Sequence, residues 1–373
     1  LSLSGAGYGV HLVERAASLG GMLPSLHRIY PLCACCKLDP RIAACDQDPN
    51  IEVLLDSQLI EFSGKVGDFK VTLETGGEKK QLEVGAVILA TGIETFDPTG
   101  QDTYPYGLNP NVVTSVEYEQ LQKPLGPNGG VLKRPSDGKT PERVAWLQCV
   151  GSRDINHCDA PYCSSVCCMY ALKEAMNTKE FDEDIETTIF YMDMRTHGKN
   201  FEDYLNNAIE KDVRLIRSRV HTVDTDTGSD NLMISYADEK GEGHSEAFDM
   251  VVLSVGLKPS SQTEQIANMV GLNLTPDQFI GCEPFKPVST NVPGIFVCGG
   301  TAGPNDIGQS VIQAAASASE VAAVIDPEPF ALPLQYPDPA ADDGQAPAIL
   351  FAYQLCPDMA PGIGEQIDAY ASK

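Results

Sequence analysis

The sequence is poor in positive charge. Lys and Arg together number 26 against 52 Asp and Glu, so the formal net charge at pH 7 is -26. A surface so rich in carboxylates repels the phosphates of nucleic acids and the headgroups of anionic lipids. We therefore expect no nucleic acid among the partners.

Long apolar runs are also missing. No segment approaches the roughly 18 consecutive apolar residues that a transmembrane helix needs. We expect a soluble, cytoplasmic protein without direct membrane insertion, whose association with any membrane complex would run through partner subunits. At 373 residues the chain is long enough for two domains of ordinary size.

Cysteine is abundant, and its distribution argues against disulfides. Nine of the twelve cysteines form two tight groups, Cys33/Cys35/Cys36/Cys45 and Cys149/Cys158/Cys163/Cys167/Cys168. Adjacent cysteines seldom suit a disulfide framework in a large α/β chain. Clustering of this kind in a cytosolic protein indicates metal or redox chemistry.

Residues 8–14 predict a short buried strand that ends in Glu14, preceded by the tail of a helix at residues 1–6. Such a strand is the second strand of a dinucleotide-binding fold, where the terminal acid binds a ribose hydroxyl about 20 residues after a glycine fingerprint. We therefore expect that fingerprint, with its own strand, upstream of Leu1. The glycines at residues 5–9 are a poor substitute, because they lie between helix and strand rather than between strand and helix.

A second dinucleotide-type unit is indicated further along. The buried strand at residues 86–92 runs into a Thr-Gly turn, and residues 249–259 repeat this pattern, which indicates a duplicated architecture. Residues 52–82 alternate as a small β-meander does. Residues 143–148 predict the first strand of the second unit, followed by cysteines instead of a glycine-rich phosphate loop. The predicted fold class is α/β, with two Rossmann-like, dinucleotide-binding domains and a small β-meander.

These motifs support a family resemblance. The segments at residues 10–14, 19–22, 90–92 and 294–299 resemble the thioredoxin-reductase-like flavoproteins. The segments Gln148–Arg153, Tyr162–Ala171 and Phe190–Asp193 resemble, more narrowly, the A subunits of heterodisulfide reductases and their relatives, including the A subunit of the quinone-interacting oxidoreductase. The resemblance implies a thioredoxin-reductase-type fold in which one domain binds FAD and the other carries an iron–sulfur cluster in place of a nicotinamide nucleotide.

By that resemblance, the ligands of a [4Fe-4S] cluster are Cys149, Cys163, Cys167 and Cys168, with Cys158 as a spare. The alternative is a set of buried structural thiols, since free cysteine packs as a small hydrophobe. Two consecutive thiolates cannot both face one cluster from a regular helix, so we expect an irregular first turn around Cys167.

The other cysteine group resembles the family through Cys33 and Cys36. It is either part of a second cluster completed by cysteines from elsewhere, or a redox dithiol, or a set of inert thiols. Cys35 or Cys45 could replace either of the two.

The residues expected to bind FAD follow from the same resemblance: Glu14, Arg15, Gly20, Gly21, Met22, Ala90, Thr91, Gly92, Gly299, Gly300 and Ile307. Gly299-Gly300 stands where related flavoproteins usually show Gly-Asp, so backbone amides there and the start of the following helix would hold the ribityl chain. Glu14 could instead be an ordinary surface acid. Arg195 and Lys199 are either partners of the cluster or flavin, or solvated surface charges.

The expected domains are an FAD-binding domain at residues 1–135, a cluster-carrying domain at 140–283 and a return to the first domain at 284–326. A linker at 327–347 and a further module or tail at 348–373 follow.

The resulting hypothesis is an oxidoreductase, namely an FAD- and iron–sulfur-dependent electron-transfer subunit that splits or merges electron pairs within a multisubunit complex. Its partners would be heterodisulfide reductase B/C-like, ferredoxin-like or hydrogenase-linked subunits, with a homodimer as one arrangement inside the complex. The alternatives are a stand-alone NAD(P)H-dependent disulfide reductase and a non-catalytic assembly scaffold.

Overall fold

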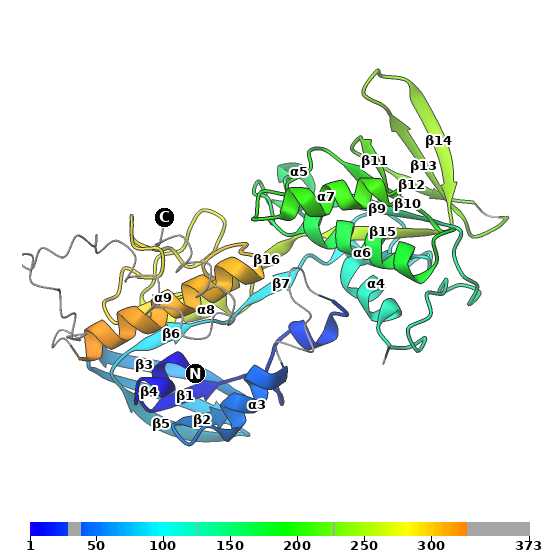
Figure 1. Cartoon of the computed structure of the whole chain (residues 1–373). Helices are drawn as coiled ribbons and strands as arrows, with labels where there is room; N and C mark the ends of the chain where they lie inside the picture. The colour runs from blue at the N-terminus through cyan, green and yellow to red at the C-terminus, as the bar shows by residue number, and fades with distance from the viewer. Residues whose placement is uncertain (29–38, 125, 227, 327–373) are drawn as a thin grey trace, which may run out of the picture. The chain divides into compact units, whose positions relative to one another are not determined.

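A computed structural model of the chain describes residues 1–28, 39–124, 126–226 and 228–326 (Figure 1). Cys33 and Cys36, together with the expected linker and tail beyond residue 326, lie outside the described residues. No helix among the described residues is long and apolar enough to cross a membrane.

The larger parallel sheet has five strands in the order β11-β10-β9-β15-β8. Its strands are β8 (Val112–Thr114), β9 (Arg143–Val150), β10 (Glu186–Tyr191), β11 (Arg214–Arg217) and β15 (Met250–Val255). Every neighbouring pair runs parallel. All six residues of β15 are buried, which is why the strand reads as a continuous apolar run and not as an alternating one.

Both faces of this sheet are covered. The helices α4 (Ser115–Gln122), α6 (Cys167–Phe181) and α7 (Phe201–Glu210) pack on one face, around the fully buried Trp146 and Tyr118. Against the other face lies the antiparallel sheet of β12 (Val223–Thr225), β13 (Leu232–Ala237) and β14 (Gly243–Phe248), with Phe190 and Phe248 between the two sheets. The sheet is therefore a rigid platform whose strand ends can position side chains.

The remaining elements form a second group of smaller sheets. The parallel pairs are β1 (Val10–Val13) with β2 (Ile51–Leu54), and β6 (Val87–Leu89) with β17 (Ile295–Val297). The predicted meander is the antiparallel sheet β3 (Ser57–Lys65), β4 (Asp68–Thr75) and β5 (Glu78–Val84). The helices are α1 (Ser2–Gly5), α3 (Asp39–Gln47), α8 (Thr263–Val270) and α9 (Ile307–Ile325), with short 3-10 turns η1 (Leu23–Ser25), η2 (Pro98–Gly100) and η3 (Gly299–Thr301). Phe69, Leu89, Ile266 and Ile295 share one core here.

The chain crosses between these two groups of sheets at residues that differ from the expected domain boundaries. β7 (Ile93–Thr95) and β16 (Leu257–Pro259) pair as an antiparallel ribbon, and β8 already belongs to the five-stranded sheet. The boundary expected at 135–140 therefore lies near residue 95. The boundary expected at 283 lies near 259, because α8 packs with the core of the smaller sheets. The physical reason is that Val112–Thr114 completes the sheet edge beside β15, a pairing that local sequence pattern does not reveal.

Candidate functional site

The cysteines at 149–168 lie at the carboxyl edge of the five-stranded sheet. In the strand order, β9 has β10 and β11 on one side and β15 and β8 on the other. The connections to the two sides of β9 therefore run in opposite directions, which makes this place a topological switch point. In open α/β sheets, ligands bind in the crevice at such a switch point. Cys149 is near the end of β9, and Cys167 and Cys168 open helix α6, which follows β9 in the chain.

The loop that connects β9 to α6 is held in an unusual backbone conformation. The non-glycine residues with positive φ in this region are Cys149 (64°), Arg153 (56°), Asp159 (49°) and Ser165 (63°). Each such residue carries strain that the surrounding contacts must offset, and such strain concentrates at functional sites. The loop is closed on itself by hydrogen bonds from Arg153 N–H to Tyr162 C=O (2.9 Å) and from Ala160 N–H to Asp154 C=O (3.1 Å).

Close packing also requires a glycine in this loop. Gly151 has a φ of 77°, and a Cβ atom there would overlap the ring of Phe96. Phe96 follows the β7 strand, so the ribbon of β7 and β16 packs directly against the cysteine loop. The loop therefore cannot accept a side chain at this position without moving the ribbon.

The four expected ligands lie in one region, although no three of their sulfur atoms lie within 4.8 Å of one another. The thiol of Cys167 experiences the charges of Cys149, Cys163 and Cys168, and that of Cys168 experiences those of Cys149 and Cys163. All four are free thiols. Their sulfur atoms contact polar groups of the surrounding edge: the Cys167 and Cys168 thiols lie 3.8 Å from Val255 O and 3.9 Å from Asp193 O, and Ser165 N–H donates to Cys163 Sγ at 3.3 Å.

Burial shapes the chemistry of these thiols. Desolvation raises the pKa of Cys149 and of Cys167 and raises that of Cys168 to about 11, because an apolar site disfavours an unpaired thiolate. A bound metal reverses this preference, since its positive charge displaces the thiol protons. The α6 N-terminus, where Cys167 and Cys168 lie, also favours negative charge. Four free thiols in one region match the number of donors that a four-iron cluster requires.

We expected an irregular first turn around Cys167, but the irregular backbone lies before helix α6. Helix α6 begins at Cys167, and Tyr170 N–H donates to Val166 C=O at 3.1 Å, as in a regular helix. The irregular backbone is at residues 163–166, with Ser165 at positive φ. The helix begins regularly because the first-turn side chains diverge enough for Cys167 to reach the end of β15 and Cys168 to reach the segment after β10.

Two arginines that accompany the cysteines share one carboxylate. Arg153 and Arg195 both pair with Asp193, which follows β10, and Arg153 Nη1 lies 4.0 Å from Cys149 Sγ. The pKa of Arg195 is raised by its hydrogen bond to Asp193 and also by the Cys163 sulfur. Arg195 was a predicted partner, whereas Arg153 and Asp193 carried no predicted role. Sequence reasoning could have found Arg153 and Asp193 as charged residues that closely follow a buried strand.

Cys158 lies apart from these four thiols. It ends the short helix α5 (Ile155–Cys158), and its thiol donates to Asp154 C=O at 3.0 Å. The charges that act on it are those of Asp154, Arg219 and Asp159 and not those of the other cysteines. This environment fits the role of a spare.

The expected flavin residues fall in two places. Ala90, Thr91 and Gly92 follow β6, and Gly299 and Gly300 follow its parallel neighbour β17. Thr301 joins them, because its hydroxyl accepts Gly92 N–H at 2.9 Å and lies 3.2 Å from the Thr91 hydroxyl. The carboxyl ends of two parallel strands thus present one connected group of turns.

One expected donor in this group is already engaged. Gly299 N–H donates to Gln313 Oε1 at 2.8 Å, a side chain that also accepts from Asn305 Nδ2. The Gly299 amide thus has an acceptor from α9, and its expected role toward the ribityl chain stays a prediction. Ile307 does open α9, after an N-cap formed by Asp306 and Gln309.

The other flavin candidates belong to the sheet of β1 and β2. Glu14 directly follows β1, and its carboxylate accepts Ala16 N–H at 2.9 Å. Arg15 lines a surface hollow of about 340 Å³ together with Asp56 and Gln58. Gly20, Gly21 and Met22 follow in the segment that leads to η1.

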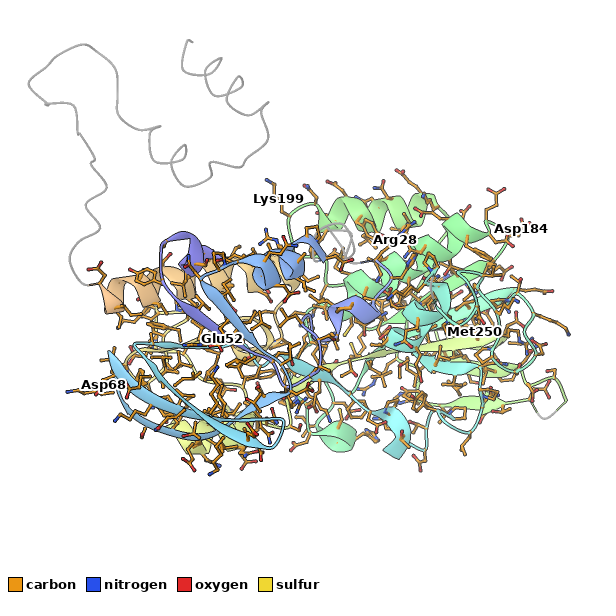
Figure 2. The ribbon with its side chains drawn as sticks, turned by 90° about the horizontal axis from the view of Figure 1, so that it is seen from below. Arg28, Glu52, Asp68, Asp184, Lys199 and Met250 are labelled. Atoms are coloured by element: carbon orange, nitrogen blue, oxygen red, sulfur yellow. The ribbon has the colours of Figure 1, made fainter. Side chains whose placement is uncertain are left out.

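Sequence reasoning missed a buried charged network behind the cysteines. Lys173 of α6 pairs with Glu119 of α4, and the two side chains are only 6% and 2% exposed. Both hold the segment before residue 29: Glu119 accepts His27 N–H at 2.9 Å, and Lys173 donates to Arg28 C=O at 2.5 Å (Arg28 is labelled in Figure 2). No short sequence motif predicts this network, because its members lie on α4, on α6 and on the segment before residue 29, which are far apart in the sequence.

Comparisons with known proteins agree with this architecture. Residues 166–322 match the sequence model of the pyridine nucleotide-disulphide oxidoreductase family. An iron-sulfur A subunit of the CoB–CoM heterodisulfide reductase of Methanopyrus kandleri is 33% identical, over 87% of this chain and 62% of the relative. The A subunit of the H2/formate:CoB-CoM heterodisulfide,ferredoxin reductase of Methanococcus maripaludis is 33% identical, over 86% and 61%. The chain thus spans about three fifths of the length of these relatives.

The fold has counterparts among solved structures. Thioredoxin reductase of Lactococcus lactis superposes with a TM-score of 0.57 at 17% identity, over 87% of this chain and 93% of that one. The predicted thioredoxin-reductase-type α/β fold is thereby confirmed. In sequence, the chain is similar to the heterodisulfide reductase A subunits over about three fifths of their length.

Proposed function

We propose that this chain is an FAD- and iron–sulfur-dependent electron-transfer component of a multisubunit oxidoreductase of the heterodisulfide reductase type. The observation that carries the proposal is the location of Cys149, Cys163, Cys167 and Cys168 in one region at the switch point of the five-stranded sheet, near enough to influence one another's pKa. This is the crevice in which a doubly wound sheet normally holds a dinucleotide. Thiols occupy it here, so the second domain holds a cluster and not a nicotinamide.

Each protein group has a distinct part in this proposal. The four thiolates hold the cluster, and the α6 N-terminus with Arg153 and Arg195 offsets its negative charge. When bound, FAD supplies two-electron chemistry with single-electron release, and the cluster passes one electron at a time. Because the positive groups favour the more negative, reduced cluster, they raise its reduction potential.

FAD belongs to the domain formed by β1, β2, β6 and β17. The supports are the position of Glu14 at the end of β1 and the connected turns at residues 90–92 and 299–301. A strand-terminal carboxylate is the group that binds a ribose hydroxyl in dinucleotide folds. The flavin would then be held by the turns after β6 and β17, at the start of α9.

The partners are proposed from the relatives. The Methanococcus maripaludis relative is named for H2 or formate, a CoB-CoM heterodisulfide and ferredoxin. By analogy, this chain would receive or deliver electrons through heterodisulfide reductase B/C-like, ferredoxin-like or hydrogenase-linked subunits. The assignment of these partners rests on the analogy with the relatives.

Composition and spectra of the anaerobically purified chain test the proposal. We expect bound FAD together with about four iron and four sulfide for each cluster, and an electron paramagnetic resonance signal after reduction. Flavin without iron would support a stand-alone disulfide reductase instead. Absence of both after reconstitution with FAD, iron and sulfide would support a non-catalytic scaffold.

A further inference from the structure

Positive charge gathers at one edge of a strongly acidic chain. Residues 193–221 carry six Lys and Arg against five Asp and Glu, whereas the whole chain carries 26 against 52. Of this segment, residues 193–200 and 218–221 lie at the carboxyl edge, directly after β10 and β11. We call the cationic groups there the basic edge: Arg153, His157, Arg195, Lys199, Arg219 and His221.

The carboxylates of this edge do not neutralise it. Asp193 is shared by Arg153 and Arg195, and Asp154 is shared by Arg219 and His157. Each acid therefore has two cationic partners, although the imidazole carries its charge only when protonated. Asp154 is also the N-cap of α5, where it accepts from two backbone amides, and it is only 11% exposed. Asp193 is 43% exposed, much like Arg195 (40%) and Arg219 (39%), so both signs of charge face solvent here and the cationic groups are the more numerous.

An exposed apolar side chain lies among these charges. Ile155, the first residue of α5, is 67% exposed, and His157 two residues further is 62% exposed. They belong to the loop that carries Cys163 and that ends at Cys167. Protein interfaces typically place an apolar centre inside a polar rim. Ile155 is such a centre, and the basic edge is such a rim.

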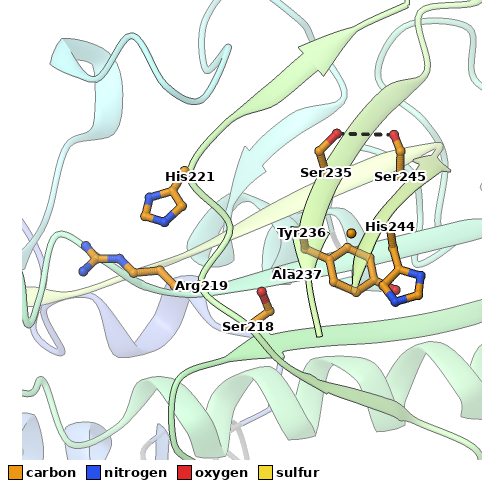
Figure 3. Close-up of a pocket in the computed structure, with 9 residues that line it drawn as sticks. Ser218, Arg219, His221, Ser235, Tyr236, Ala237, His244 and Ser245 are labelled. Carbon is orange, nitrogen blue, oxygen red and sulfur yellow. Dashed lines mark hydrogen bonds between the residues drawn. The ribbon is translucent and has the colours of Figure 1, made fainter. Parts of the chain in front are cut away.

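A surface hollow of about 770 Å³ extends the basic edge toward the β13–β14 hairpin. Figure 3 shows Arg219 and His221 on one side of it and Tyr236 with His244 on the other. Tyr236 and His244 stack at 5.2 Å between ring centroids. The positive region ends there, because Asp238 and Glu242 come close to His244 at the hairpin.

We propose that Ile155 and the basic edge form the docking surface for a small acidic iron–sulfur protein that exchanges one electron with this chain. The inference rests on the proposed function, because it places the entry or exit of electrons next to Cys163. The carrier is itself the reductant or oxidant: it loses one electron as this chain gains one, or the reverse, and no bond or proton is transferred.

Charge distribution selects this partner. A small anion would be best held by charges that converge on one enclosed point, whereas the basic edge is spread over the loops after three strands, around an exposed isoleucine. Because the chain as a whole carries 52 acidic against 26 basic residues, an acidic carrier is favoured in the orientation that meets the basic edge. Such complementarity fixes orientation and speeds encounter more than it raises affinity.

Binding to an acidic bacterial ferredoxin, measured by calorimetry with the anaerobic holoprotein, tests the proposal. The ionic strength should be about 0.1 M, where the Debye length is about 10 Å and distant carboxylates are screened while contacting charges still attract. We expect Ile155→Glu and Arg219→Glu each to weaken binding about tenfold. Ile155 is exposed, so its replacement leaves the fold and the flavin and cluster spectra unchanged.

Lys139→Glu is the matched control. Lys139 is 79% exposed and precedes β9, so it lies at the opposite edge of the same sheet, and its replacement changes the charge as Arg219→Glu does. We expect less than a twofold effect. Equal weakening by Lys139→Glu, or unchanged binding after Ile155→Glu, overturns the docking surface. A chain that lacks a cluster but binds ferredoxin at this edge would contradict the proposed function and leave the docking surface standing.

Discussion

The thiols of Cys167 and Cys168 belong to adjacent residues, yet they contact the ends of two different strands, β15 and the segment after β10. A single helix turn can serve one cluster in this way because the strand ends on either side of β9 are near neighbours. The residues that make this possible are the positive-φ positions before α6, above all Ser165. The local strain is offset by the hydrogen bonds that close the loop.

Replacement of Cys168 by serine tests the ligand set. We expect Cys168→Ser to reduce the iron content and to change the electron paramagnetic resonance spectrum, while FAD remains bound because the flavin belongs to the other domain. Cys158→Ser is the control, since its thiol is bonded to Asp154 C=O and lies apart from the other four. Unchanged iron and an unchanged spectrum in Cys168→Ser would show that Cys168 only packs.

Glu246 should make the stability of the second domain depend on acid pH. Its hydrogen bonds with Arg214, helped by Tyr236 and Arg143, lower its pKa from 4.5 to about 2. A depressed folded-state pKa adds stability above the unfolded-state pKa, and that contribution is lost as the pH falls from about 4.5 to about 2.

We expect Glu246→Gln to lower the free energy of unfolding by about 1 kcal/mol at pH 7, with solvent screening taken into account. The difference from the wild type should shrink below pH 4.5, as measured by urea denaturation at several pH values. A difference that stays constant down to pH 2.5 would contradict this account.

At the scale of elements, α6 serves two functions, one at its first turn and one in its middle. Its first residues carry Cys167 and Cys168, and further along the helix the buried Lys173 pairs with Glu119 of α4. Burial lowers the pKa of Lys173 and raises that of Glu174, whose carboxylate accepts from Trp146 Nε1 at 2.8 Å. The helix is therefore held by polar contacts on the side where Lys173 also donates to Arg28 C=O, beside Glu119 of α4, which accepts His27 N–H.

Breaking this buried pair should destabilise the protein strongly. We expect Glu119→Gln to cost about 3–5 kcal/mol in the free energy of unfolding, because it leaves the Lys173 ammonium buried without its counter-charge. The double variant Glu119→Leu/Lys173→Met should recover much of this loss, since apolar side chains of similar volume replace both charges. Denaturant titration measures both. A double variant less stable than Glu119→Gln would mean that the contacts to His27 and Arg28 outweigh the ion pair.

On the scale of the whole molecule, the chain crosses between its two groups of sheets through the antiparallel ribbon of β7 and β16. The ribbon is packed against the cysteine loop through Phe96 and Gly151. Gly256, just before β16, is equally tight: a Cβ there would lie 2.7 Å from Gly151 O. The connection between the two domains and the loop that carries Cys149 are thus parts of one packed region.

This organisation predicts the nucleotide selectivity of the chain. We expect no tight, stoichiometric binding of NADH or NADPH to the second domain, because cysteines and not a glycine-rich loop connect β9 to α6. Fluorescence titration of the FAD-loaded chain with NADH measures this. Saturable binding at one NADH per chain would favour a pyridine-nucleotide disulfide reductase.

Much of the fold followed from local patterns. The apolar strands at residues 86–92, 143–148 and 249–255, the meander and the final helix all have sequence signals that depend only on neighbouring residues. The domain boundaries were wrong because Val112–Thr114 joins the second sheet through pairing with β15, a contact between distant residues. The hydrogen bond from the Gly299 amide to Gln313 of α9 is likewise a contact between distant residues that local pattern does not reveal.

The sequence by itself determined the residue types of the site: a cysteine run directly after a buried strand, where a phosphate loop would otherwise be. Residue type and spacing are local properties, so a single sequence shows them. Only the tertiary structure decided that Cys149, Cys163, Cys167 and Cys168 lie in one region at the switch point, that Arg153 and Arg195 share Asp193, and that Ile155 is exposed near the basic edge. These relations depend on strand order and on which loops lie side by side, and strand order is set by packing between distant segments.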